Sequence, residues 1–308
     1  MLMAMAMMST NDVGTTMVAA ANNNGIGTGN GAGNGSGNPP AKDPEEDVDL
    51  LVQYTNVKGK NAAMQYANNG KLERDIPSAR IVAIKSKRKN IAALSDNPFI
   101  EHVGLDMIHT TLGFPDDLKA NDGSNHGPYL RKLAEDGYST LYGLSQVQAD
   151  LVPQSTAKFM KVCVIDTGYG LGHSDLPSTG VTGINPYSTG QWDVDGHGHG
   201  THCAGTIGAI GGNDNGITSV NPDPSKFNFM IGKGLQDSGS GSTSAILQAG
   251  FWCANNGANI ISMSLGCNGC SDSSVRSQWE TIYNSGVLIV AAAGNSGDSN
   301  LSFPASYP

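Results

Sequence analysis

The stretch "KVCVIDTG", residues 161–168, begins with a short apolar run and ends in an acid and a turn. A run of this length and composition is typical of a buried strand. Strand-like and helix-like segments then alternate to the end of the chain, which predicts an α/β domain with a parallel sheet flanked by helices on both faces. The expected strands are 161–165, 227–235, 259–263 and 287–293, and the expected helices are 201–210, 243–257 and 271–286.

Polar and small residues follow directly after three of these strands. Asp166 follows the first, Ser264-Leu265-Gly266 follow the third, and Gly294-Asn295 follow the fourth. In open parallel sheets the functional site lies outside the carboxyl ends of the strands, so these residues are candidates for a common site. Asp166 has two interpretations at this point. It is either a structural cap or an ionised carboxylate that orients a histidine.

Three histidines gather in "DGHGHGTHCAGT", residues 195–206. A catalytic base is expected where a histidine opens a helix beside an acid, which favours His199. We expect His202 to be buried within the helix and His197 to be solvated. A metal site is the alternative, but His199 and His202 supply at most two ligands on one helical turn, and the HExxH pattern is absent.

Four motifs, "VIDTG", "GHGTHCAGTI", "ISMSLG" and "AAAGNSG", together resemble the subtilisin-like serine proteases, peptidase family S8. The resemblance runs from about Tyr142 to Pro308. It implies a serine-type endopeptidase that hydrolyses peptide bonds by Asp-His-Ser acyl-enzyme chemistry. Asp166 resembles the acid of the triad, His199 the general base and Asn295 the side chain that donates to the oxyanion.

The resemblance also implies a peptide-binding groove. Gly239 and Gly241 in "DSGSG" resemble an edge segment along which a substrate lies as an added strand. Ser264, Leu265 and Gly266 resemble the opposite wall. Backbone pairing is largely blind to side chains, so polypeptide substrates and broad specificity are implied. A Gly/Ser turn and an ordinary strand end are the alternative interpretations.

No cofactor is expected for catalysis, but a structural calcium ion is implied by the resemblance. Asp175 in "GHSDL" and Asn213 in "GGNDNG" resemble its ligands in some family members. Both side chains offer the oxygen atoms that a hard cation requires. A polar surface loop would have the same composition.

The chain before this domain divides by composition. The segment 48–107 reads as a compact α/β module and resembles the family's inhibitory propeptide, which implies a small ferredoxin-like fold. It is basic in the stretch 51–107, with nine Lys/Arg against five Asp/Glu, whereas residues 140–308 hold five against eleven. Opposite charges favour association of the two parts. The expected organisation is a disordered start with a Gly/Asn-rich linker (1–47), the propeptide (48–107), a connector (108–139) cut near 135–141, and the catalytic domain (140–308).

The third member of the triad, the nucleophilic serine, is not found in the sequence. Its "GTSMA"-like motif should follow Asn295, and the chain ends at Pro308 before such a motif. "GSTSA", residues 241–245, is similar, but it precedes Asn295, and Ser244 is better explained as a residue that caps or begins a helix. A truncated sequence explains this best. A catalytically dead subtilisin-fold peptide-binding protein and a metal-dependent hydrolase are the alternatives.

The net charge and the cysteine content limit which partners, disulfides and metal sites the protein can have. The net charge of −9 argues against a nucleic-acid partner, and no apolar run is long enough to span a membrane. Five cysteines cannot all pair within one chain. Cys163 and Cys203 are expected as buried thiols, and Cys267 and Cys270 as a disulfide or half a zinc site, with zinc disfavoured because no second CxxC exists.

The resemblance implies a secreted monomer whose partners are polypeptide substrates and its own propeptide. Met1–Met8 is apolar but short and lacks a basic start, so it fits a secretory signal poorly.

Overall fold

The computed structural model describes residues 42–112, 142–152, 158–213, 215–297 and 299–308. The principal division of these residues falls between Met107 and Ile108, which separates two compact units. No helix among the described residues is long and apolar enough to cross a membrane.

The smaller unit is an antiparallel sheet with two helices. Its sheet order is β2-β3-β1-β4, and the chain order of strands and helices is the ferredoxin-like βαββαβ arrangement. Its elements are β1 (Asp47–Tyr54), α1 (Val57–Tyr66), β2 (Leu72–Ile76), β3 (Ile81–Lys87), α2 (Asn90–Ser95) and β4 (Ile100–Leu105), with short 3-10 turns at Asn68–Gly70 and Pro77–Ala79. The polar strand β2, "LERDI", was not predicted, because an edge strand needs no apolar run.

The larger unit is built on a five-stranded parallel sheet of order β12-β10-β6-β8-β7. The predicted parallel α/β architecture is confirmed. Its strands are β6 (Met160–Ile165), β7 (Thr182–Ile184), β8 (Phe227–Gly232), β10 (Ile260–Met263) and β12 (Leu288–Ala291). Because all five run in one direction, the residues that follow β6, β10 and β12 leave the sheet at the same edge.

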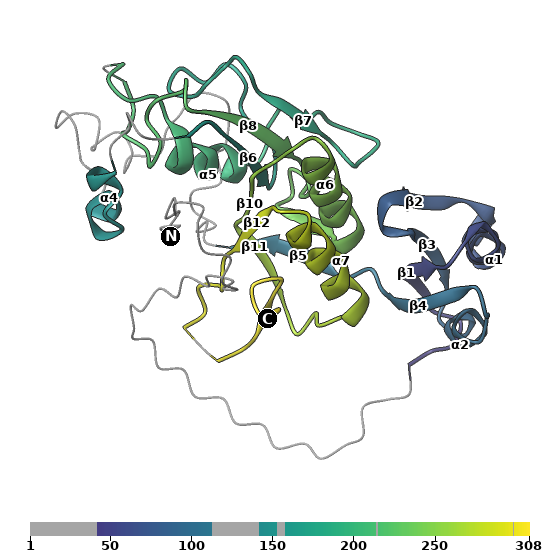
Figure 1. Cartoon of the computed structure of the whole chain (residues 1–308). Coiled ribbons are helices and arrows are strands. Elements are labelled where there is room, and N and C mark those ends of the chain that lie inside the picture. Colours follow the sequence, from purple (N-terminus) through teal and green to yellow (C-terminus); the bar gives the residue numbers. More distant parts are fainter. Residues whose placement is uncertain (1–41, 113–141, 153–157, 214, 298) are drawn as a thin grey trace. The chain divides into compact units, whose positions relative to one another are not determined.

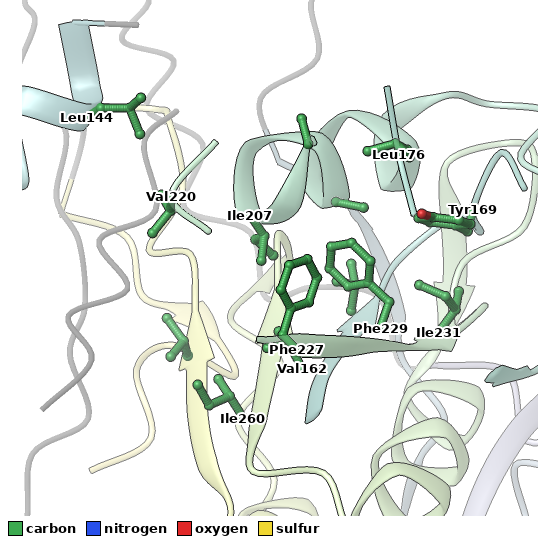
Figure 2. Close-up of a cluster of buried hydrophobic side chains, with 14 residues drawn as sticks. Leu144, Val162, Tyr169, Leu176, Ile207, Val220, Phe227, Phe229, Ile231 and Ile260 are labelled. Carbon is green, nitrogen blue, oxygen red and sulfur yellow. The ribbon is translucent and has the colours of Figure 1, made fainter. Parts of the chain in front are cut away.

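Helices cover both faces of this sheet, as the alternation of side chains along β6 requires (Figure 1). Val162 packs in the cluster that contains Ile207 of α5 (His199–Gly208), together with Phe227 and Phe229 of β8 (Figure 2). Its neighbour on β6, Cys163, points the other way and forms a disulfide with Cys253 of α6. The remaining helices are α6 (Thr243–Asn255), which packs against α7 (Ser273–Asn284), α4 (Tyr142–Gln146) and a 3-10 turn at Ala149–Leu151.

The cysteines therefore differ from the sequence-based expectation at one position. Cys163 is not a thiol, because it faces α6, where Cys253 lies directly opposite. Cys267 and Cys270 form the second disulfide, and Cys203 stays free.

A second, antiparallel sheet of order β13-β11-β5-β9 positions the site. Its strands are β5 (Ile108–Thr111), β9 (Ser240–Ser242), β11 (Leu265–Asn268) and β13 (Ser302–Phe303). β5 lies between β9 and β11, although the sequence predicted a connector from residue 108 onward. Residues 113–141, which include the predicted cleavage region, lie outside the described residues.

Candidate active site

An acid and an imidazole meet at the edge of the parallel sheet. Asp166 follows β6, His199 opens α5, and their side chains are buried, with Nδ1 of His199 2.7 Å from Oδ1 of Asp166. Burial disfavours the charged ring, but the hydrogen bonds with the Asp166 carboxylate and the Cys203 thiol outweigh burial and raise the pKa of His199. The carboxylate therefore fixes the ring, and Nε2 is the nitrogen left for chemistry.

That second nitrogen faces strand β5. Nε2 of His199 lies 3.3 Å from the carbonyl oxygen of Leu112, the residue that follows β5. Nδ1 thus donates its proton to the Asp166 carboxylate, and Nε2 is the ring atom that faces Leu112. The Leu112 carbonyl thus lies beside the ring nitrogen that exchanges protons with the nucleophile and the leaving group in acyl transfer.

β5 fills a groove between two walls, and the backbone forms the contacts. The Thr111 amide donates to the Gly239 carbonyl at 2.9 Å, and the Leu112 amide donates to the Ser264 carbonyl at 3.0 Å. On one side His109 pairs with Gly241, and on the other Thr111 pairs with Leu265 and Thr110 with Gly266. All five residues that were predicted to bind substrate therefore line this strand.

Two of the wall positions require glycine. A Cβ atom at Gly241 would overlap the Gly234 carbonyl. One at Gly266 would overlap Oγ of Ser302 and lie 2.9 Å from Cδ1 of Leu112, so a side chain there would displace both residues.

The side chains of β5 alternate between pocket and solvent. His109 is buried, whereas Ile108 is 57% exposed. Nε2 of His109 lies 3.0 Å from Oγ1 of Thr243. Burial lowers the pKa of His109 to about 4, against a smaller opposite effect of the Phe303 backbone. The pocket around it is lined by Thr243, Ile246, Cys270, Val275, Trp279, Pro304 and Tyr307.

Comparison with known proteins identifies this arrangement. The subtilase family model, Peptidase_S8, matches residues 157–308. Residues 157–308 form a subtilase domain.

Two relatives with known names are subtilisin DY of Bacillus licheniformis and alkaline elastase YaB of Bacillus sp. strain YaB. Subtilisin DY is 40% identical, and the match covers 54% of this chain and 60% of the relative. Alkaline elastase YaB is 36% identical, and the match covers 67% of this chain and 56% of the relative. The match therefore spans somewhat more than half the length of each of these two relatives.

Solved structures agree on the fold. The subtilisin-like protease Apa1 of Pseudoalteromonas sp. AS-11 is 42% identical, with a TM-score of 0.50, over 55% of this chain and 39% of that one. Fervidolysin of Fervidobacterium pennivorans is 22% identical, with a TM-score of 0.60, over 86% and 42%, a likeness that bears on the fold alone.

Two histidines of the subtilase domain lie differently from the prediction. His202 is exposed, because it points away from the face of α5 that carries Gly200, Ala204 and Ile207 into the core. His197 is buried instead of solvated. A Cβ at Gly239 would lie 2.7 Å from its Nε2, and its ring packs edge-on against His199 with centroids 6.2 Å apart.

The remaining predicted positions are also placed by the fold. Asn295 is exposed and lies four residues beyond the end of β12, a strand whose carboxyl end is on the same edge of the sheet as that of β6. Ser244 is buried in the first turn of α6, and its hydroxyl bonds the hydroxyl of the capping residue Ser242 at 2.9 Å. This is the helix-start role that the sequence favoured for Ser244.

The two predicted calcium ligands lie together. Nδ2 of Asn213 donates to Oδ1 of Asp175 at 3.1 Å, and the Ile217 amide donates to Oδ2 at 2.9 Å. Asp175 is buried, and its carboxylate accepts hydrogen bonds from both Asn213 and Ile217.

Sequence reasoning missed the residues that hold the acid and the base in register, namely Thr167, Asp195 and Gly200. Gly200 follows the base, and a Cβ there would overlap the Gly168 carbonyl and lie 3.1 Å from Cβ of Asp166. The signal was present in the sequence, since "DTG" and "DGHGHGT" place small or hydroxyl residues next to both catalytic candidates.

This close approach gives a stability prediction. Gly200→Ala is expected to lower the free energy of unfolding by about 1–3 kcal/mol, because the new methyl group forces backbone shifts in a packed site. Gly205→Ala in the same helix is the control. Its Cβ would meet only Cδ2 of Leu176 at 3.9 Å, so it is expected to stabilise the helix by up to ~1 kcal/mol. Urea unfolding curves of both variants measure the difference, and equal effects would contradict the packing argument.

Proposed function

We propose that the native protein is a serine endopeptidase of the subtilisin type, and that the chain described here is a self-blocked zymogen form. Asp166 orients His199, and His199 takes the proton of the nucleophile. Asn295 donates its amide to the developing oxyanion. The nucleophile is the serine expected in a GTSMA-like segment after Asn295.

One observation supports the proposal above the others, namely that β5 lies in the groove as a substrate would. The carbonyl of Leu112 lies 3.3 Å from Nε2 of His199, and both neighbouring strands pair with the same segment. The carbonyl that faces the base is that of Leu112, so acyl transfer at this carbonyl would break the Leu112–Gly113 bond. We propose this bond as the site of self-cleavage, in place of the region near residues 135–141.

The reaction at this bond balances as an acyl transfer. The serine oxygen adds to the Leu112 carbonyl carbon while His199 accepts the hydroxyl proton. The carbon–nitrogen bond breaks, and His199 returns that proton to the Gly113 amine. Water then hydrolyses the acyl-enzyme, again with His199 as base.

The substrate class follows from the same groove. Hydrogen bonds from Thr111 and Leu112 go to the carbonyls of Gly239 and Ser264, so any extended polypeptide satisfies them. Side-chain selection is left to the pocket that holds His109 and to the space against Gly266 that holds Leu112. Broad endopeptidase specificity is therefore proposed.

The smaller unit is proposed as the inhibitory propeptide, and the protein as secreted. The ferredoxin-like topology and the positive charge of residues 51–107 support the first proposal. Two disulfides, Cys163–Cys253 and Cys267–Cys270, support the second, because disulfides persist in oxidising compartments.

A fluorophosphonate probe tests the proposed chemistry, since it labels only an activated serine. After removal of the groove segment, the native protein is expected to be labelled, and His199→Ala is expected to abolish labelling. His202→Ala is the control, because that side chain is exposed on the same helix. Absence of labelling in the native protein would favour the catalytically dead peptide-binding protein instead.

The same experiment with a chelator addresses the metal-dependent hydrolase. Among the residues that the structure describes, the ligand atoms that lie close enough to share an ion are those of Asp166, His199 and Cys203, within 4.8 Å of one another, and His202 does not belong to this group. Labelling and hydrolysis are expected to survive chelation. Loss of hydrolysis that added metal restores would contradict the serine mechanism.

We also propose a structural calcium ion at Asp175 and Asn213. A buried carboxylate beside an amide that can present its oxygen fits a hard cation. Calcium is expected to raise the Tm in a saturable manner, because it binds the folded state. Asp175→Asn should abolish the rise, whereas Asp223→Asn should retain it. A Tm that does not respond to calcium would contradict the site.

A further inference from the structure

A second carboxylate lies next to the acid and the base. Asp195 is partly buried in the turn before α5. Its Oδ1 accepts the Gly198 amide at 2.9 Å, and its Oδ2 accepts the Thr201 amide at 2.8 Å and the Thr201 hydroxyl at 2.6 Å. The residue at the N-cap of α5 is Gly198, which has no side chain to cap the helix. Asp195, three residues before the N-cap, therefore accepts the hydrogen bonds of amides at the start of α5 that a capping side chain would otherwise accept.

The same carboxylate is connected to the strand that carries the catalytic acid. The Thr167 hydroxyl donates to Oδ1 of Asp195 at 2.8 Å and accepts the Gly200 amide at 2.9 Å. Thr167 follows Asp166, and Gly200 follows His199. Hydrogen bonds of Thr167 thus form a second link, or bridge, between β6 and α5. Its residues Thr167 and Gly200 are the chain neighbours of Asp166 and His199, which form the first bridge.

The two bridges form a closed ring. The Asp166–His199 bond is one side, and the contacts of Thr167 with Gly200 and with Asp195 are the other. Any rotation or sliding of α5 against β6 would have to break both bridges together. This closed set of hydrogen bonds therefore restrains the distance between Asp166 and His199, on which the orientation of the imidazole depends.

We propose that Asp195 is a positioning residue that fixes His199 relative to Asp166, beyond its service as a helix cap. The charge of Asp195 is required for this, because amide and hydroxyl donors approach both of its oxygens. An asparagine would turn an NH₂ group toward one set of these donors and break either the cap or the bridge. The opposite side of Thr167 is held by Lys233, whose ammonium contacts the Thr167 carbonyl and bonds the Val194 carbonyl at 3.1 Å.

The inference rests on the proposed role of the Asp166–His199 pair, but its test does not require peptide hydrolysis. In protein labelled with ¹⁵N-histidine, NMR follows the shared Nδ1 proton of His199 and its titration. The wild type is expected to show a strongly downfield Nδ1 proton. Asp195→Asn is expected to lose this resonance and to titrate His199 at lower pH. Asp193→Asn, in the same loop and with the same change of charge, is expected to keep both.

A second pair of variants separates positioning from capping. Thr167→Val removes the hydroxyl that links Asp195 to Gly200 and leaves the contacts of Asp195 with Thr201 in place. It is expected to lose the downfield proton, and Thr167→Ser is expected to retain it. If Asp195→Asn fails to fold, this pair decides the outcome. A lower Tm with an unchanged His199 resonance in both Asp195→Asn and Thr167→Val would overturn the proposal, whereas failure of fluorophosphonate labelling would count against the proposed function alone.

Discussion

Asp166→Asn is expected to lower the kcat of the native protein on peptide substrates by about four orders of magnitude, with little change in KM. The magnitude is that known for triad acids, including the acid of subtilisin, and the geometry here gives its cause. Oδ1 of Asp166 receives the Nδ1 proton of His199 at 2.7 Å, and an asparagine amide in its place would favour the wrong tautomer. The groove residues are unaffected, so binding is retained.

Asp166→Asn is also expected to shift the dependence of kcat/KM on pH. Asp166 raises the pKa of His199, so the imidazole becomes a neutral base only as the pH rises through that value. Loss of the carboxylate moves this rise in kcat/KM to lower pH. Asp223→Asn is the control, because Asp223 precedes β8 and so lies at the opposite edge of the parallel sheet. A loss of less than about tenfold in Asp166→Asn would contradict the role of the acid.

Acidification from pH 8 to pH 5 is expected to raise the equilibrium constant for release of strand β5 from the groove by about 30-fold. The pKa of His109 falls to about 4 in the pocket, from an ordinary value of 6.5. The docked strand therefore holds a neutral ring and is fully stable above pH 6.5. Its stability is lost progressively as the pH falls from 6.5 toward 4, because the released ring gains a proton that the docked ring cannot hold.

The pocket offers no compensating charge to a protonated His109. Its lining residues are Thr243, Ile246, Cys270, Val275, Trp279, Pro304 and Tyr307, of which Tyr307 is neutral with a raised pKa and Cys270 is in a disulfide. Amide exchange of Thr111 and Leu112, corrected for intrinsic rates, measures the release. His109→Gln should remove the pH dependence and His102→Gln should keep it. Exchange that does not change between pH 8 and pH 5 would exclude His109 as the cause.

The parallel sheet and its functional edge were predictable because buried strands and their carboxyl-terminal residues are local features of sequence. "KVCVI" and "NIISM" are apolar runs of strand length, and Asp166 and Ser264 follow them directly. The position of His199 near the start of a helix was also predictable, because small residues follow it directly in "GTHCAGT".

The segment that fills the groove was not predictable in this way. "IHTT" in β5 has no apolar periodicity, and it becomes a strand because β9 and β11 pair with it on both sides. The histidines show the same limit. His197 is buried by Gly239, a residue 42 positions later in the chain, and His202 is exposed by the rotation of α5. The Cys163–Cys253 disulfide is not predictable from the sequence, because the position of Cys253 opposite Cys163 depends on tertiary packing.

The most direct test is the mass of the amino-terminal fragment that we expect the native protein to release when it first processes itself. The contacts of Leu112 with His199 and Ser264 predict a fragment that ends at Leu112, and a protein that retains residue 113 at its new amino terminus. His199→Ala should release no fragment and His202→Ala should release the same one. A first cut elsewhere, such as at residues 135–141, or a cut that persists without His199, would contradict the account.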